Sequence, residues 1–336
     1  MYENVDLTLP QRLVLRHVRN VSAFLISRIP CIYVAIVLTS LFGSPVSADH
    51  FRVFLLGGQS NMGGVAPVED LEPPFDQPNE DVWIWQDDEV ANVGWTALRG
   101  GFSGSGSTGN DDTFGPEVSL GDTLAGSFGT DRVAFVKHGE AGVGATMQLG
   151  WNPDLGGGQG PGQIYSDFLD KTNKALSFLA NDGHSFEVSG VFFAQGNRDT
   201  SPNEDGGNAA VEYEANFSNF TNALRNEFET PNLPIVFGQL GDFAINHENP
   251  IRRRNVRLVR DAQASVAAND PWASMVVTDD ISKLDHAHFD AAGQIDFGQR
   301  LGNAYLELVA VPEPSSGALA GFAVVCWFFY RKRRRN

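Results

Sequence analysis

Two short segments, far apart in the sequence, carry the residue types of a nucleophilic catalyst. The first, at 58–62, is Gly-Gln-Ser-Asn-Met and contains Ser60. The second, at 285–288, is Asp-His-Ala-His and contains Asp285 and His288. A serine hydroxyl is a weak nucleophile until a base takes its proton, and a histidine held by a carboxylate is such a base. We therefore expect Ser60, His288 and Asp285 to form a Ser-His-Asp catalytic unit.

The segment before Ser60 predicts how the chain positions it. The apolar run at 51–56 is typical of a buried strand, and the glycines and polar residues after it predict a tight corner. A serine at such a corner is exposed, and a following helix would point its first N–H groups toward it.

Strand and helix patterns alternate along the rest of the chain. Further apolar runs that predict buried strands lie at 133–137, 188–194, 235–240 and 275–278. Helical patterns lie between and after them, at 163–181, 208–229, 252–268 and 289–309. This alternation predicts an α/β fold, a three-layer α/β/α sandwich around a parallel sheet of about five strands.

The polar residues of interest all follow predicted strands. In an open α/β sheet, ligands bind beyond the carboxyl ends of the strands. The segments at those ends are 58–62, 137–140, 195–199, 241–242 and 285–288. We therefore expect a nucleophile, a base, a carboxylate and several amides to meet at one edge of the sheet.

Two long segments, 66–116 and 139–162, are rich in glycine, proline and acidic residues and predict loops over the sheet. Tryptophans occur in or beside them, at Trp83, Trp85, Trp95 and Trp151. These side chains either form a binding surface or only pack the loops down, since Trp needs a half-buried position in either case.

Three segments together resemble a known family. The segment at 58–62, Phe-Gly-Pro-Glu at 114–117 and Asp-x-x-His-Phe at 285–289 are similar to blocks of the SGNH hydrolase superfamily. The most similar branch is that of the sialate O-acetylesterases, which includes the acetylxylan esterases of carbohydrate esterase family six. The resemblance spans about 51–308 in the same order. It implies a flavodoxin-like sandwich and the removal of O-acetyl groups from a carbohydrate, an acetylated polysaccharide or a sialate-like sugar, through an acyl-enzyme.

The resemblance also implies an oxyanion hole, made of the N–H groups of Ser60 and Gly115 and the side-chain amide of Gln195. Pro116 at the first turn of a helix needs no N–H, which would leave the Gly115 N–H free to face the site. The third block departs from the branch, which usually has Gln-Gly-Glu-x-Asp where 195–199 is Gln-Gly-Asn-Arg-Asp. Asn197 thus replaces a carboxylate, and it is the alternative to Gln195 as the amide donor.

Other polar and aromatic residues near these blocks are candidates for the substrate pocket. They are Gln59, Asn61, His138, Trp151 and Asn197. His286 and His138 compete with His288 as the base, but only His288 has the Asp-x-x-His spacing.

No metal or cofactor is expected. The serine mechanism is complete without one, and His-Glu-x-x-His does not occur in the sequence. The segment 199–208 is rich in Asp, Asn and Gly, but it lacks the EF-hand spacing and is better explained as a solvated loop.

Both ends of the chain predict export. Arginines within 11–28, an apolar stretch at 31–42 and small residues at 44–48 have the order of a secretory signal peptide with an N-terminal extension, over 1–48. The last residues, 311–336, resemble the PEP-CTERM sorting tag, which implies export, transient membrane retention and removal by a transpeptidase. A retained anchor at either end is the alternative, although both apolar stretches are shorter than the roughly 20 residues of a bilayer span.

The 262 residues of 49–310 are long enough for one large domain. This region holds 15 Lys and Arg against 38 Asp and Glu, a net charge of −23, which disfavours nucleic acid and anionic membranes as partners. The two cysteines, Cys31 and Cys326, lie in the terminal segments, so the domain has no disulfide and no thiolate metal site.

These observations predict an exported serine esterase that deacetylates carbohydrate in the cell envelope, at the cell surface or outside the cell. Its partners would be acetylated carbohydrate and the export and sorting machinery. A non-catalytic exported glycan-binding protein of the same fold is the alternative, supported by the altered third block. A lipid or aryl esterase of the same superfamily is a third, weaker alternative.

Overall fold

A computed structural model of the chain describes residues 49–87, 93–102, 112–142, 144–204, 208–243 and 245–310. The segments 1–48 and 311–336, which carry the predicted signal peptide and sorting tag, lie outside the described residues. None of the described helices is long and apolar enough to cross a membrane.

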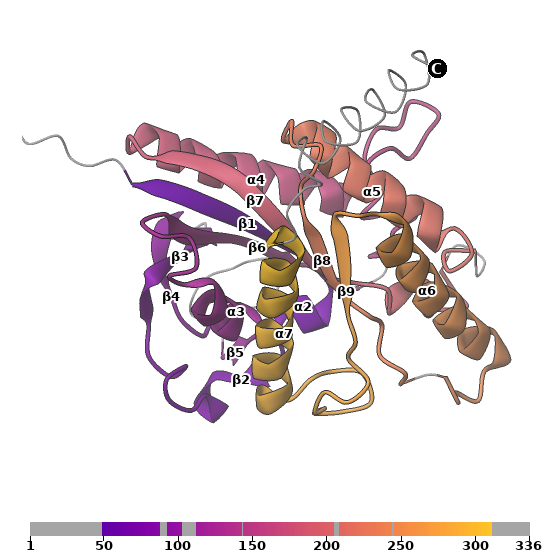
Figure 1. Cartoon of the computed structure of the whole chain (residues 1–336). Helices are drawn as coiled ribbons and strands as arrows, with labels where there is room; N and C mark the ends of the chain where they lie inside the picture. The colour runs from indigo at the N-terminus through magenta and orange to yellow at the C-terminus, as the bar shows by residue number, and fades with distance from the viewer. Residues whose placement is uncertain are drawn as a thin grey trace, which may run out of the picture. The chain divides into compact units, whose positions relative to one another are not determined.

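A seven-stranded sheet forms the centre of the described region, in the order β4-β3-β6-β1-β7-β8-β9 (Figure 1). Strand β4 pairs antiparallel with β3, and the other pairings in this sheet are parallel. The strands are β1 (His50–Gly58), β3 (Asn79–Asp87), β4 (Val93–Leu98), β6 (Arg132–Gly139), β7 (Ser185–Ala194), β8 (Ile235–Gly238) and β9 (Ala273–Val276). A second, two-stranded pair joins β2 (Ala66–Pro67) to β5 (Thr113–Phe114).

Helices cover both faces of the sheet (Figure 1). On β1, Phe51, Val53 and Leu55 enter one apolar core with residues of α4, α5 and α6, whereas Phe54 and Leu56 enter a second core with residues of α3 and α7. Alternate side chains of the buried central strand thus feed the two layers, as the period of a strand requires. The longer helices are α3 (Glu117–Leu124), α4 (Gln163–Asn181), α5 (Tyr213–Glu227), α6 (Pro250–Asn269) and α7 (Ala291–Ala310).

The predicted α/β/α sandwich is confirmed, with two more strands than expected. Strands β3 and β4 lie in the segment 66–116 that was predicted as loop. Their aromatic residues pack inward: the Trp85 ring lies 5.5 Å from that of Trp95 and 4.9 Å from that of Phe178. The Trp95 indole N–H donates to the Ala175 carbonyl oxygen at 3.1 Å. These tryptophans therefore attach the sheet edge to α4, and the charged and proline-rich flanks masked the strand signal.

Strand β1 lies at the topological switch point of the sheet, where the strand order reverses. Its neighbours are β6 on one side and β7 on the other, so connections on the two faces of the sheet diverge beside its carboxyl end. A crevice outside such a switch point is where open α/β sheets bind ligands. The helix α2 (Ser60–Gly63) begins there.

Candidate active site

The turn that carries Ser60 is held against β7 by a close backbone approach. Gly58 has a φ of 141°, and a Cβ there would lie 2.3 Å from the Ala194 carbonyl oxygen. The next N–H, of Gln59, donates to that same oxygen at 2.8 Å. Only glycine fits this position, and the turn therefore presents Ser60 at the carboxyl end of β1.

The structure brings Ser60, His288 and Asp285 together. The Ser60 Oγ lies 3.0 Å from His288 Nε2, and His288 Nδ1 lies 2.8 Å from Asp285 Oδ2. Asp285 Oδ1 accepts the backbone N–H groups of Ala287 at 2.7 Å and His288 at 2.8 Å. The carboxylate thus orders its own loop and also orients the imidazole, which leaves Nε2 as the atom that faces the serine.

The Asp285 carboxyl stays ionised in this arrangement. Partial desolvation acts to raise its pKa, but the hydrogen bonds from the His288 ring and from the N–H groups of Ala287 and His288 outweigh it and hold the pKa well below its usual range. A negative charge at Asp285 is what stabilises an imidazolium at His288.

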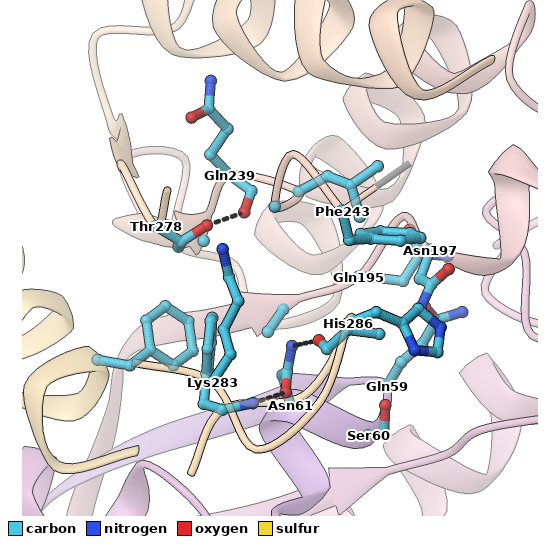
Figure 2. Close-up of a pocket in the computed structure, with 17 residues that line it drawn as sticks. Gln59, Ser60, Asn61, Gln195, Asn197, Gln239, Phe243, Thr278, Lys283 and His286 are labelled. Atoms are coloured by element: carbon cyan, nitrogen blue, oxygen red, sulfur yellow. Dashed lines mark hydrogen bonds between the residues drawn. The ribbon is translucent and has the colours of Figure 1, made fainter. Parts of the chain in front are cut away.

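Asn61 joins the nucleophile turn to the loop that carries His288 (Figure 2). Its Nδ2 donates to the Ala287 carbonyl oxygen at 2.9 Å, and its Oδ1 accepts the Phe289 N–H at 3.2 Å. These two bonds flank His288 in the sequence, so Asn61 fixes the loop relative to Ser60. The sequence predicted Asn61 as a pocket residue, and it does line a hollow that Ser60 also borders, but this positioning contact was not foreseen.

His286 lies apart from the Ser60–His288–Asp285 contacts. The chain at 284–288 is a turn closed by the Leu284 N–H on the His288 carbonyl oxygen, not an extended segment. The His286 ring instead lies 6.1 Å from the Phe243 ring. Of the two histidines in this loop, only His288 forms a hydrogen bond with Ser60 among the described residues, whereas His286 lines a hollow that Ser60 also borders.

The prediction that the Gly115 N–H faces the site is wrong. That N–H donates to Glu117 Oε1 at 3.1 Å. Glu117 is fully buried and forms an ion pair with Lys137, which is also fully buried and donates to the Phe102 carbonyl oxygen. The carboxylate needs these donors because an unpaired buried charge is costly. A Cβ at residue 115 would lie 2.8 Å from the Met62 carbonyl oxygen, so the backbone of the second block packs directly against α2.

The preference for Gln195 as the amide donor also conflicts with the structure. The Gln195 Nε2 group donates to the Ala145 carbonyl oxygen at 3.0 Å and to Asp199 Oδ2 at 2.5 Å. An amide nitrogen carries two hydrogens, so both are committed to the protein interior. Asp199 is completely buried, and this burial raises its pKa to about 7, despite the opposing hydrogen bonds from Gln195 and from the Met147 N–H.

Asn197 has the orientation that Gln195 lacks. Arg252 Nη2 donates to Asn197 Oδ1 at 3.3 Å. Because a guanidinium only donates, this contact identifies the oxygen of the amide and leaves Nδ2 as the other end. Nδ2 has no hydrogen-bond acceptor among the described residues, and neither have the N–H groups of Ser60 and Asn61. Asn197 and Ser60 both line two hollows at this edge of the sheet, one of which is drawn in Figure 2.

His138 and Trp151, predicted as pocket residues, belong to the core. Trp151 is fully buried and His138 is 4% exposed, and their rings lie 6.0 Å apart beside Phe168. Burial, together with the nearby Lys171 cation, lowers the pKa of His138 to about 3. A neutral histidine enclosed by aromatic rings contacts no substrate here, so the prediction for both residues is wrong.

Two hollows flank Ser60 and share Gln59, Ser60 and Asn197. The smaller, of about 40 Å³, has an apolar wall made by Ala194, Leu240, Phe243, Phe289 and Phe297. The larger, of about 240 Å³, is polar and lies next to Arg198 and Arg252. Gln59, predicted as a pocket residue, borders both hollows, while its Nε2 donates to the Ala145 carbonyl oxygen at 2.6 Å.

Within the described part of the chain, no three His, Cys, Asp or Glu side chains are grouped so that they could hold a metal ion. The acidic residues Asp199 and Glu204 of the 199–208 segment both accept hydrogen bonds from the protein, Asp199 from Met147 and Gln195 and Glu204 from Gly144.

Two family models match the chain. A family model described as "Carbohydrate esterase, sialic acid-specific acetylesterase" matches residues 50–307, and a model of the PEP-CTERM protein-sorting motif matches residues 310–335. The first match covers the region with the predicted blocks, and the second covers the predicted sorting tag. No curated protein matches the sequence significantly.

Several solved structures share the fold. A protein from Arabidopsis thaliana is 19% identical, with a TM-score of 0.56 over 77% of this chain and 98% of that one. A carbohydrate acetylesterase from Xanthomonas citri is 19% identical, with a TM-score of 0.52 over 76% of this chain and 56% of that one. NanS is 14% identical, with a TM-score of 0.55 over 78% of this chain and 98% of that one. At these identities the similarity shows the fold alone.

Proposed function

Because the chain belongs to the carbohydrate esterase family of sialic acid-specific acetylesterases and is a carboxylic ester hydrolase, we propose that it removes O-acetyl groups from carbohydrate by a Ser-His-Asp mechanism. The observation that carries this proposal is the continuous chain of contacts from Ser60 Oγ to His288 Nε2 and from His288 Nδ1 to Asp285 Oδ2, at 3.0 and 2.8 Å. The three side chains are thus already in the geometry that proton transfer requires.

In the first half of the reaction, Ser60 Oγ attacks the ester carbonyl carbon and His288 Nε2 takes the hydroxyl proton. The Asp285 carboxylate stabilises the imidazolium. The tetrahedral oxyanion receives hydrogen bonds from the Ser60 N–H and from Asn197 Nδ2, which have no described acceptor of their own. Collapse of this intermediate breaks the ester C–O bond, and His288 returns the proton to the leaving sugar oxygen.

In the second half, water attacks the acetyl-serine carbonyl while His288 takes its proton, and acetate leaves as Ser60 Oγ recovers a proton. The small apolar hollow suits the acetyl group, since Phe289 and Phe297 would exclude bulk water from its methyl. The larger polar hollow, which also borders Ser60, suits the sugar. The Xanthomonas citri protein of similar fold is a carbohydrate acetylesterase, which supports this assignment of substrate class.

We propose further that the domain acts outside the cytoplasm. The match to the sorting motif over residues 310–335 supports export. On this proposal the chain is cleaved after 48, and the segment from 311 is removed or retained in the membrane. N-terminal sequencing and the intact mass of the native protein test this. A full-length chain recovered from the cytoplasm would contradict it.

Acetate release is the direct test of the activity. The purified native protein should release acetate from at least one member of a panel of acetylated sugars and polysaccharides, whereas Ser60→Ala should not. Sugar binding without acetate release would instead support the non-catalytic glycan-binding alternative. Hydrolysis of aryl acetates with no release from any carbohydrate would point to an aryl esterase.

A further inference from the structure

Helix α6 supports the segment that carries Asn197. Three polar side chains on one face of this helix donate hydrogen bonds to the segment 195–200: Arg252, Asn255 and Gln263. Gln263 Nε2 donates to the Gln195 carbonyl oxygen at 3.2 Å, and Asn255 Nδ2 donates to the Thr200 carbonyl oxygen at 3.3 Å. These two contacts hold the backbone of the segment, whereas Arg252 contacts a side chain, that of Asn197.

The positive charge of Arg252 is not needed for support alone. Asn255 and Gln263 hold the same segment with neutral amides. Arg252 forms no ion pair with any described carboxylate, and its side chain makes one hydrogen bond among the described residues, to the neutral Asn197 Oδ1 at 3.3 Å. Its buried Nε has no hydrogen-bond partner within the same part of the chain. The charge is therefore directed at a single neutral group.

The position of Arg252 makes its charge unfavourable for folding. It lies in the first turn of α6, where no acidic residue occurs and the helix dipole is positive. Burial and the neighbouring Arg198 cation lower the pKa of Arg252, which means that the protein destabilises its charged form. The guanidinium lies 5.5 Å from the Phe243 ring centre, a contact that holds it beside Asn197. A cation kept at such a position indicates a role beyond stability.

A guanidinium fixes the orientation of an amide, because it can donate but cannot accept a hydrogen bond. A neutral partner such as glutamine both donates and accepts, so it would allow the Asn197 amide to turn round. In the reversed orientation Oδ1 would face the tetrahedral oxyanion and repel it, and a donor would be lost. A hydrogen bond from a cation also polarises the amide, which strengthens the N–H groups at Nδ2.

We propose that Arg252 is a positioning residue for ester hydrolysis: its guanidinium holds Asn197 with Nδ2 toward the oxyanion and strengthens that donor. This inference rests on the proposed function. Arg252, Asn197 and Ser60 all line the larger hollow, so the pair lies beside the nucleophile. Arg252 acts on the reacting atoms only through Asn197, and this dependence is what an experiment can test.

The test measures hydrolysis of p-nitrophenyl acetate by the full-length protein and its variants. This ester has no sugar, so a contact between Arg252 and a sugar cannot contribute to the rate. Arg252→Met removes the donor and the charge, and it should lower kcat about tenfold or more, as expected for loss of a hydrogen bond to a charged group. KM should stay nearly unchanged, because both half-reactions use the same oxyanion donors.

A double-variant comparison separates positioning from a general structural role. In the Asn197→Ala background, Arg252→Met should cause almost no further loss of kcat, since the donor that Arg252 positions is already absent. Arg252→Lys keeps a charge that only donates, so it should recover part of the kcat that Arg252→Met loses. Arg254→Met is the matched control: Arg254 is exposed on the same helical turn and lines neither hollow, so kcat should equal that of the wild type. Urea unfolding verifies that each variant is folded in the assay.

Each outcome decides one proposal. Wild-type kcat in Arg252→Met, the same fold-loss of kcat on Arg252→Met with and without the Asn197 side chain, or equal kcat for Arg252→Lys and Arg252→Met overturns the positioning role and leaves the esterase proposal intact. Hydrolysis by Ser60→Ala at the wild-type rate contradicts the serine mechanism itself and with it the role of Arg252.

Discussion

The two sides of Ser60 are built in different ways. On the base side, the loop at 284–289 is ordered by contacts among its own residues, with Asp285 bonded to three groups within three positions, and by contacts with the neighbouring residues Ser60 and Asn61. On the donor side, the segment at 195–199 is held by partners more than 40 residues away, such as Ala145, Met147 and Arg252. A short motif therefore specifies the base side, whereas tertiary contacts decide which amide on the donor side is free.

The largest effect should come from the base side. His288→Ala should lower kcat by roughly 10⁴-fold or more, because the serine proton then has no acceptor. His286→Ala should lower it much less, since His286 contacts Phe243 and not Ser60. Steady-state hydrolysis of p-nitrophenyl acetate measures both. An inactive His286 variant beside an active His288 variant would reverse the assignment of the base.

The donor side can be tested by comparing its two amides. Asn197→Ala should lower kcat by roughly 10²–10³-fold with little change in the unfolding midpoint, as expected for loss of an oxyanion donor. Gln195→Ala should act mainly on stability, because its amide bonds Ala145 and Asp199 in the interior. Urea unfolding and kcat should be measured on the same preparations. A larger kcat loss in a fully folded Gln195 variant would restore Gln195 as the donor.

Loss of the contact between the nucleophile turn and the base-side loop should have an intermediate effect. Asn61→Ala removes both bonds that hold the His288 loop to the nucleophile turn. We expect kcat to fall by up to about 10²-fold with KM nearly unchanged, since small misplacements of reacting groups cost rates of this order. Asn61→Asp keeps only the acceptor for the Phe289 N–H, so its kcat should lie between that of the wild type and that of Asn61→Ala. If both variants retain wild-type kcat, the loop does not depend on Asn61.

The smallest expected effect is a change in the free energy of unfolding that comes from Asp199, on the donor side. Burial raises the folded-state pKa of Asp199 to about 7, well above the value of about 4 in an unfolded chain. The folded state therefore binds more protons between these values, and the free energy of unfolding should fall as pH rises from about 4 to about 7. Asp199→Asn should lose this contribution, and its amide could donate to the unpartnered Gln195 Oε1.

Urea unfolding at pH 5 and pH 8 measures the difference in the free energy of unfolding between this variant and the wild type. The difference should shift in favour of Asp199→Asn at the higher pH. A difference that does not depend on pH would mean that Asp199 does not titrate in this range.

The sequence was sufficient for the features that depend on local pattern. Helix 163–181 has its predicted bounds, because its apolar spacing matches one buried face and glycine precedes it. The parallel core strands were recognisable as continuous apolar runs. Strands β3 and β4 were missed because a single short run, around Trp83 and Trp85, lies among acidic and proline residues, and a loop composition dominated the prediction.

In the site, too, the sequence predicted which residues come together but not which hydrogen bonds their atoms form. The blocks placed Ser60, Asp285 and His288 correctly next to one another, but a block does not state whether an N–H or an amide already has an acceptor. Gly115 and Gln195 are both committed to buried carboxylates, of Glu117 and Asp199, that lie close by in the sequence. The run of three arginines at 252–254 did not indicate that Arg252 donates to Asn197 Oδ1, because this contact depends on the fold.

The central claim is that Ser60 is the nucleophile and passes through an acyl intermediate. Pre-steady-state hydrolysis of p-nitrophenyl acetate, followed by intact-mass and peptide-mass measurement after rapid acid quench, tests it most directly. We expect a burst of nitrophenol close to one equivalent per enzyme and one acetyl group on the peptide containing Ser60, both absent from Ser60→Ala. An acetyl group on another residue, or full turnover by Ser60→Ala, would contradict it.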